Sequence, residues 1–193
     1  DEALINVPDV VGKDFDEATE MITSANLKVE KNEIYDNNVA AGLVISQAPQ
    51  AGSSQKGGTK ILLTVSLGKQ PVTVKFNSLG GTCPESERTV YYTETYGELP
   101  VPTMQYHKFL GWYTAEKSGS QVEADTKVNN VNSQTLYARW ERIYVRVAFD
   151  ANGGKVGTSS TNIAMGEKYS LPTPERKYLS LIHISEPTRP EPI

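Results

Sequence analysis

The residues of this chain that could carry out covalent or metal chemistry are few. Among its 193 residues there is one cysteine, Cys83, and there are two histidines, His107 and His183. A serine or cysteine nucleophile needs a base such as histidine beside it, and a structural zinc ion needs four ligands, usually Cys and His. We read Cys83 as a free thiol in a turn and His107 as a surface residue. The sequence therefore predicts a protein that is not an enzyme and that holds no metal or cofactor.

Two loops begin like ligand-binding motifs but do not complete them. Residues 150–154 (Asp-Ala-Asn-Gly-Gly) start like a calcium loop, yet they lack its closing bidentate carboxylate. Gly57 and Gly58 are not followed by the helix of a phosphate-binding loop. We interpret both loops as turns at the ends of strands. Counting acids does not exclude a glycosidase-type pair of carboxylates, but segments this short predict no cleft of adequate size.

Two adjacent tyrosines, Tyr91 and Tyr92, are our candidate ligand contacts. The chain has 10 tyrosines against 4 phenylalanines, which suggests half-exposed strands. An exposed tyrosine offers a ligand both an apolar ring and a hydroxyl group. The alternative, that these tyrosines only complete the packing of a strand, stays open.

Charge and hydropathy exclude two classes of partner. The formal net charge is −4 and the sequence pI is about 5.3, whereas a nucleic-acid binder needs a basic face to neutralise phosphates. No apolar run approaches the roughly 20 residues of a membrane-spanning helix. Since there is neither an initiator methionine nor a basic-then-apolar leader, we expect a piece of a longer protein. We expect no nucleic-acid partner, no membrane span in this piece, and a monomer.

A change of charge near residue 70 divides the chain. Residues 1–70 contain ten acids and six lysines but no arginine, whereas residues 71–193 contain equal numbers of acids and bases. Residues 67–71 have the composition of a linker. We therefore predict one domain over residues 1–69 and a second over residues 70–142.

The first domain is predicted to contain one helix and several strands. Asp14 and Glu17 have the spacing of a capping box, and Asn26 suits the left-handed residue that ends a helix. Between them, apolar residues recur at helical spacing at Phe15, Ala18, Ile22 and Ala25. Apolar and β-branched runs predict strands at Leu27–Val29, Leu43–Gln47 and Thr59–Ser66.

From residue 72 onward the sequence predicts strands without a convincing helix. Two stretches alternate apolar with polar residues, the apolar set being Val72, Val74, Phe76, Leu136, Ala138 and Trp140. The pattern Val-x-Phe-Asn/Asp followed by Gly-Gly occurs at residues 74–81 and again 73 residues later, at 147–154. Because the correspondence stops near residue 178, we predict a partial second repeat over residues 143–178.

Residues 5–68 resemble a PASTA domain, a small extracellular module of bacterial wall-sensing kinases and penicillin-binding proteins. The shared residues are Val7-Pro8-Asp9-Val10-Val11-Gly12, Glu17-Ala18, Leu27, Gly42-Leu43-Val44-Ile45-Ser46-Gln47, Pro49, Gly52, Lys56-Gly57, Leu63-Thr64-Val65-Ser66 and Gly68. Asn26 departs from the glycine that is usual there. The resemblance implies an α+β fold with one helix on a three-stranded sheet, and peptidoglycan fragments as a partner. Because those fragments carry carboxylates and this segment has no arginine, we expect weak binding.

Residues 72–140 resemble an internalin-B-type repeat, also called the Listeria–Bacteroides repeat, which occurs in tandem on bacterial surface proteins. The shared residues are Val74-x-Phe76-Asn77, Gly80-Gly81, Tyr96-Gly97-x-Leu99-Pro100-x-Pro102, Phe109-x-Gly111-Trp112-Tyr113 and Leu136-Tyr137-Ala138-Arg139-Trp140. This resemblance implies a sheet-rich, β-grasp-like module in which both tryptophans pack in the core rather than form a sugar platform. Residues 145–178 resemble the first half of another such repeat.

Residues 179–190 resemble no domain. Their sequence is similar to the in-frame translation of a transposon adapter used in preparing sequencing libraries. We therefore expect residues 179–193 to be a non-native tail and assign no function to His183.

Together the resemblances imply a non-enzymatic fragment of a cell-surface protein from a Gram-positive bacterium. In this interpretation an extracellular, wall-associated or spacer module carries adhesin-type repeats, whose partner is a host or bacterial surface ligand. The alternative is the extracellular sensor region of a PASTA-bearing transmembrane Ser/Thr kinase or penicillin-binding protein that binds peptidoglycan. A non-catalytic appendage of a secreted hydrolase is a third interpretation.

Overall fold

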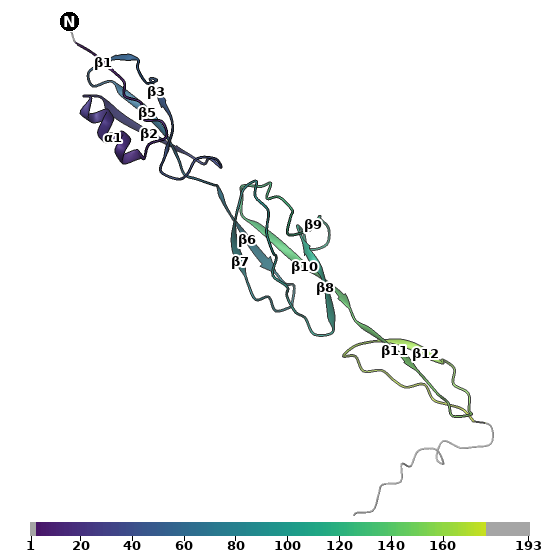
Figure 1. Cartoon of the computed structure of the whole chain (residues 1–193). Coiled ribbons are helices and arrows are strands. Elements are labelled where there is room, and N and C mark those ends of the chain that lie inside the picture. Colours follow the sequence, from purple (N-terminus) through teal and green to yellow (C-terminus); the bar gives the residue numbers. More distant parts are fainter. Residues whose placement is uncertain (1–2, 177–193) are drawn as a thin grey trace, which may run out of the picture.

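The computed structural model describes residues 3–176. Figure 1 shows two folded modules that follow one another along the chain, and then a two-stranded hairpin. The last two residues of the expected partial repeat and the expected tail over residues 179–193 lie outside the described residues.

The helix of the first module, α1 (Phe15–Ser24), begins at the predicted cap. The carboxylate of Asp14 accepts the N–H of Asp16 at 2.9 Å, which satisfies one of the free donors of the first turn. The second half of the predicted capping box is wrong: Glu17 pairs with the ammonium of Lys13 instead of the Asp14 N–H. The helix ends where expected, since Asn26 has a left-handed φ of 59°.

The sheet of the first module has the expected three strands, in the order β2 (Lys28–Ile34), β5 (Lys60–Ser66) and β3 (Val44–Ala48). Strand β2 is longer than predicted and runs parallel to β5. Two short strands that the sequence did not predict, β1 (Leu4–Asn6) and β4 (Ser54–Lys56), form a separate antiparallel pair. The helix and sheet enclose one buried cluster: Val7, Val10, Ala18, Ile22, Leu27, Val44, Ile61, Leu63 and Val65.

The second module is a five-stranded sheet, and its described residues form no helix. The strand order is β7 (Glu87–Tyr91), β6 (Pro71–Asn77), β10 (Gln134–Arg142), β8 (His107–Tyr113) and β9 (Gln121–Val122). Strands β6 and β10 are parallel, and the other neighbours are antiparallel. The chain therefore enters and leaves this module on two strands that lie side by side.

The core of the second module is built around Trp112, which is 1% exposed. Its ring centroid lies 5.0 Å from that of Phe76 and 5.6 Å from that of Phe109, and its Nε1 donates to the carbonyl of Pro100 at 2.7 Å. The half-buried Trp140 packs on the same cluster, and its Nε1 donates to the carbonyl of Ser78. Both tryptophans are thus packing residues of this module.

The second copy is a hairpin of β11 (Tyr144–Ala148) and β12 (Ser160–Ala164). Its first turn has the same hydrogen bond as that of the first copy, because Asp150 Oδ1 accepts the Asn152 N–H as Asn77 Oδ1 accepts the Leu79 N–H. The structure therefore shows the turn at residues 150–154 as a strand-ending turn.

Candidate ligand-binding surfaces

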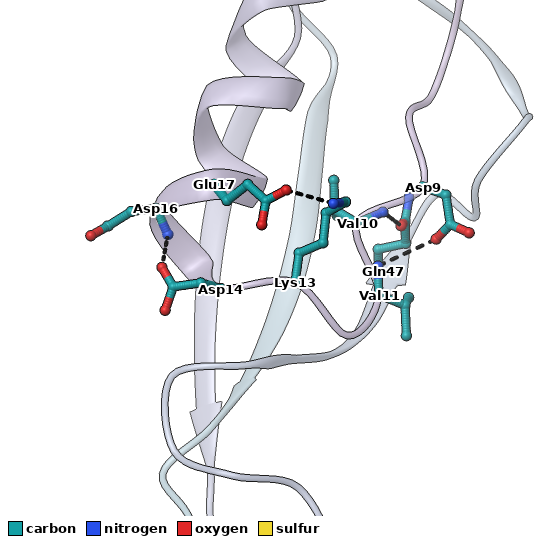
Figure 2. A network of polar contacts seen from close by, with 8 residues as sticks. All are labelled: Asp9, Val10, Val11, Lys13, Asp14, Asp16, Glu17 and Gln47. Carbon is teal, nitrogen blue, oxygen red and sulfur yellow. Dashed lines mark hydrogen bonds and ion pairs between the residues drawn. The ribbon is translucent and has the colours of Figure 1, made fainter.

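Hydrogen bonds made by Asp9 and Gln47 hold the loop of residues 8–12 in place (Figure 2). Gln47 Oε1 accepts the N–H of Val10 at 2.8 Å, and Gln47 Nε2 donates to the carbonyl of Pro8 at 2.9 Å. Asp9 Oδ1 accepts the N–H of Val11 at 3.3 Å, which closes a tight turn. The polar groups of Asp9 and Gln47 are thereby used inside the loop.

Lysines of the first module form ion pairs with carboxylates among the described residues. The pairs are Lys13–Glu17, Lys31–Glu33, Lys60–Glu30 and Lys69–Glu94. An anionic ligand that approached any of these ammonium groups would meet a carboxylate beside it. This arrangement disfavours a strong carboxylate-binding site there.

A groove of about 590 Å³ lies where the two modules meet. It is lined by Tyr35, Ala41, Leu67, Gly68, Lys69, Pro71 and Tyr91. Tyr35 and Tyr91 are 47% and 44% exposed, and both residues line the groove. An open groove with two tyrosines suits a neutral ligand that stacks on rings and accepts or donates hydrogen bonds.

The two candidate tyrosines lie in different surroundings. Tyr91 is the last residue of β7 and lines the groove between the modules, whereas Tyr92 is partly buried and packs against the core of the second module. Tyr91 ends the strand and Tyr92 begins the turn that follows it, and this change of backbone direction separates the two neighbours in space. The sequence did not predict that Tyr35 and Leu67 line this groove. The available signal was that each residue directly follows the end of a strand, β2 or β5.

The ion pair at this groove is well formed. Lys69 Nζ lies 2.7 Å from Glu94 Oε1, and this hydrogen bond holds the pKa of the Glu94 carboxyl below its usual value. Lys69 and Glu94 come from different sides of the boundary between modules. The positive charge that Lys69 brings to the groove is therefore neutralised by Glu94 of the second module.

The guanidinium of Arg88 is also engaged within the second module. It donates through Nε and a terminal nitrogen to the two oxygens of Glu85, and through its other terminal nitrogen to the carbonyl of Glu98. The hydrogen bond from Arg88 holds the pKa of Glu85 below its usual value, and Glu85 raises the pKa of Arg88. Nε, Nη1 and Nη2 of Arg88 are thus all engaged in hydrogen bonds within the module.

Cys83 and His107, the two described residues that were considered for covalent and metal chemistry, lie in different surroundings. Cys83 packs against the core of the second module, and Nδ1 of His107 lies 2.8 Å from the carbonyl of Gln105. Within residues 3–176, His, Cys, Asp and Glu side chains do not gather in groups of three that could hold a metal ion. The helix in this part of the chain is too short to span a membrane.

Comparison with known families finds the two modules in the predicted order. Residues 5–67 match the PASTA domain, and residues 73–139 match the Listeria-Bacteroides repeat domain. The boundaries agree with the predicted resemblances to within one residue at each end.

Curated relatives match over a small part of their length. A protein of Evansella cellulosilytica described as a Gly-rich membrane protein is 36% identical over 107 residues, which are 54% of this chain and 12% of that protein. A protein of Corynebacterium glutamicum described as the serine/threonine-protein kinase PknB is 34% identical over 73 residues, 37% of this chain and 11% of the kinase. This chain thus spans about an eighth or less of either relative.

A solved structure of the three-PASTA-domain region of a Ser/Thr kinase from Staphylococcus aureus is also similar to this chain. The match has a TM-score of 0.36 at 15% sequence identity, and it covers 69% of this chain and 98% of that one.

Proposed function

We propose that this chain, in which a PASTA domain precedes a Listeria–Bacteroides repeat, is a non-enzymatic part of a protein displayed on a bacterial surface. The observation that carries this proposal is the order of the modules, because one PASTA domain passes directly into a repeat of another fold. PASTA domains of wall sensors usually occur as tandem copies. The relatives described as membrane proteins support an extracellular or surface-associated location.

In this proposal the PASTA domain acts mainly as a spacer near the cell wall. Its motif residues Asp9 and Gln47 hold the loop of residues 8–12, and its lysines Lys13, Lys31, Lys60 and Lys69 are paired with carboxylates. A muropeptide carboxylate is best bound by the fork of an arginine, and residues 1–70 contain none. Recognition is left to the repeat and to the groove at its boundary.

The proposed repeat fold is of the β-grasp type. Its five strands lie in the order second, first, fifth, third and fourth along the sequence of the module. The parallel pairing of its first and last strands, β6 and β10, supports this assignment. The segment between β7 and β8, where a helix would cover the sheet, instead carries Tyr96 and Pro100 against the core.

A titration with defined muropeptides tests the spacer role. The ¹⁵N-labelled chain of residues 1–193 is titrated, and amide shifts in residues 5–67 are followed. We expect no saturable change at low micromolar ligand. Saturable shifts in that range, lost in Lys31→Ala or Lys60→Ala, would show that the PASTA domain is a receptor.

The second candidate function is the extracellular sensor region of a Ser/Thr kinase. The similarity to kinases of Corynebacterium, Bifidobacterium and Streptomyces favours it. The same titration separates the two functions, because a sensor requires saturable binding and a spacer does not.

The proposed ligand contact of the repeat is Tyr91, in the groove between the modules. We expect Tyr91→Ala to lower retention of the labelled chain on an array of neutral oligosaccharides several-fold, because a stacking ring is lost. Tyr144→Ala is the matched control, since Tyr144 is 60% exposed and lies outside the groove. Equal retention of the wild-type chain and the Tyr91 variant would remove Tyr91 from the site.

A further inference from the structure

One turn occurs twice in the chain, and each time it is in contact with the module that comes before it. We call it the joint turn: residues 92–94 after β7 in the first repeat, and residues 165–167 after β12 in the second copy. The two occurrences are 73 residues apart, which is the spacing of the repeat. Within each, the third residue donates its N–H to the last residue of the preceding strand, Glu94 to Tyr91 and Glu167 to Ala164.

The first contact is a backbone hydrogen bond to the connecting segment. The N–H of Tyr92 donates to the carbonyl of Gln70 at 2.9 Å. At the second joint, the N–H of Met165 donates to the carbonyl of Ile143 at 3.0 Å. Gln70 and Ile143 each lie immediately before the first strand of their repeat, so the bond fixes the start of that strand to the joint turn.

The second contact is an ion pair at equivalent positions. Lys69 Nζ lies 2.7 Å from Glu94 Oε1, and an Arg142 guanidinium nitrogen lies 2.8 Å from Glu167 Oε1. Lys69 belongs to the connection after the PASTA domain, whereas Arg142 is the last residue of β10 in the first repeat. The PASTA domain and the first repeat, which differ in fold, therefore each end in a cationic residue that pairs with the equivalent glutamate of the next repeat.

The third contact involves the middle residue of the joint turn and a loop of the preceding module. Asn37 Nδ2 donates to Thr93 Oγ1 at 2.7 Å in the first joint. In the second joint Gly166 lies against the ring of Tyr106, and a Cβ atom at residue 166 would clash with that ring. Gly166 also has a φ of 82°, so glycine is required there on two grounds.

We infer that the joint turn is a docking surface by which each repeat receives the module before it, whatever the fold of that module. The partner it fits is a module whose chain leaves with Lys or Arg and which places a loop on the middle residue of the turn. Exposed ion pairs are individually weak, but the ion pair and the loop contact hold the preceding module at two separate points, while the bond to Gln70 or Ile143 fixes the start of the repeat's own first strand. This inference goes beyond the proposed function, because the contacts between modules do not depend on which ligand the protein binds.

Residual dipolar couplings of the ¹⁵N-labelled chain of residues 1–193 test the first joint. We expect the PASTA domain and the first repeat to give alignment tensors of equal magnitude and direction. Lys69→Glu places two carboxylates at the joint, and we expect the two tensor magnitudes to differ by about twofold or more. The exchanged pair Lys69→Glu with Glu94→Lys should restore equality.

The matched control is Lys60→Glu, which breaks the exposed pair with Glu30 at the other end of β5. We expect it to leave the two tensors equal. The inference is overturned if the wild-type tensors already differ, if Lys69→Glu leaves them equal, or if the exchanged pair does not restore them.

The second joint is tested in the same way. Arg142→Glu and Gly166→Ala should each separate the alignment of β11–β12 from that of the first repeat. The exchanged pair Arg142→Glu with Glu167→Lys should restore it. Unchanged couplings of β11–β12 in both single variants would show that the joint turn does not hold the preceding module.

Discussion

The first repeat and the second copy begin with the same hairpin but bury it differently. In the first repeat, Val72 and Val74 are 2% and 0% exposed under the face completed by β8 and β10. In the second copy the residue equivalent to Val72 is Val145, which is 46% exposed, and Val147 is only partly buried. The comparison shows that local sequence forms the turn and the strand pair, whereas burial of the apolar face depends on strands distant in sequence.

The largest expected difference between the two copies is in amide exchange of the full chain. We expect amides of β6 to exchange on the order of a hundredfold more slowly than those of β11, because opening β6 requires disruption of a packed core. Hydrogen exchange followed by NMR measures this difference. Equal protection in β6 and β11 would show that the second copy is stabilised by contacts outside the described hairpin.

Removal of the core tryptophan should make the core of the first repeat less well packed, as in the second copy. Trp112→Ala deletes the buried ring and leaves the carbonyl of Pro100 without its donor, so we expect a loss of about 3–5 kcal/mol in the free energy of unfolding of the repeat. Urea unfolding followed by Trp140 fluorescence measures it. Val101→Ala, at a 67% exposed side chain, is the control. A Trp112 variant as stable as this control would contradict the assigned core.

Two equivalent glycines sharpen the comparison. A Cβ at Gly81 would lie 2.6 Å from the ring of Trp140 and 2.9 Å from the carbonyl of Thr103. We expect Gly81→Ala to cost about 1–3 kcal/mol in the stability of the first repeat, because both the ring and a backbone group must move. Gly154→Ala is the equivalent change in the second copy, and it should leave urea unfolding of the first repeat unchanged. Equal effects of the two variants would be evidence against the tight contact at Gly81.

The smallest expected effect concerns two equivalent tyrosines and pH. The hydroxyl of Tyr96 donates to Gln134 Oε1 at 2.6 Å, and burial raises the pKa of Tyr96 above its usual value. A raised pKa means that folding favours the neutral form, so this contribution to stability is present below about pH 10 and is lost as the pH rises further. Tyr96→Phe should lower the free energy of unfolding at neutral pH by about 1 kcal/mol, and it should reduce the loss of stability at alkaline pH. Tyr169→Phe, at a 43% exposed position, should change neither.

Thermal unfolding of the three proteins from pH 7 to pH 11 measures the alkaline loss. The assignment to Tyr96 fails if Tyr96→Phe and the wild-type chain lose stability in parallel above pH 10.

Local signals accounted for the parts of the fold that depend on neighbours in sequence. Asp14 and Asn26 predicted both ends of α1, because caps act within one turn of helix. Strands β1 and β4 could not be predicted, since each has three residues and the pairing joins Leu4 to Lys56 across the module. Residues 30–33 of β2 are polar and exposed, so only the pairing with β5 extends the strand to Ile34.

The candidate site was predicted only in part for a similar reason. The sequence predicted Tyr91 and Tyr92 together as exposed aromatic residues, but it could not show that β7 ends between them and that only Tyr91 lines the groove. The pairing of Lys69 with Glu94 had no signal at all. Charged residues on exposed segments show no periodicity, and the two groups meet only when the PASTA domain and the repeat are both folded.

The parallel pairing of β6 with β10 has a mechanical consequence. The chain enters the first repeat at the start of β6 and leaves it at the end of β10, so tension along the chain pulls these neighbouring strands in opposite directions and loads their hydrogen bonds in shear. Strands β11 and β12 are antiparallel, and the chain enters and leaves them at the same end, so tension breaks their bonds one pair at a time. Resistance to force is governed by the rate of unfolding rather than by equilibrium stability. Under a steady pull the second copy should therefore open like a zipper and lengthen the molecule first, while the first repeat stays closed.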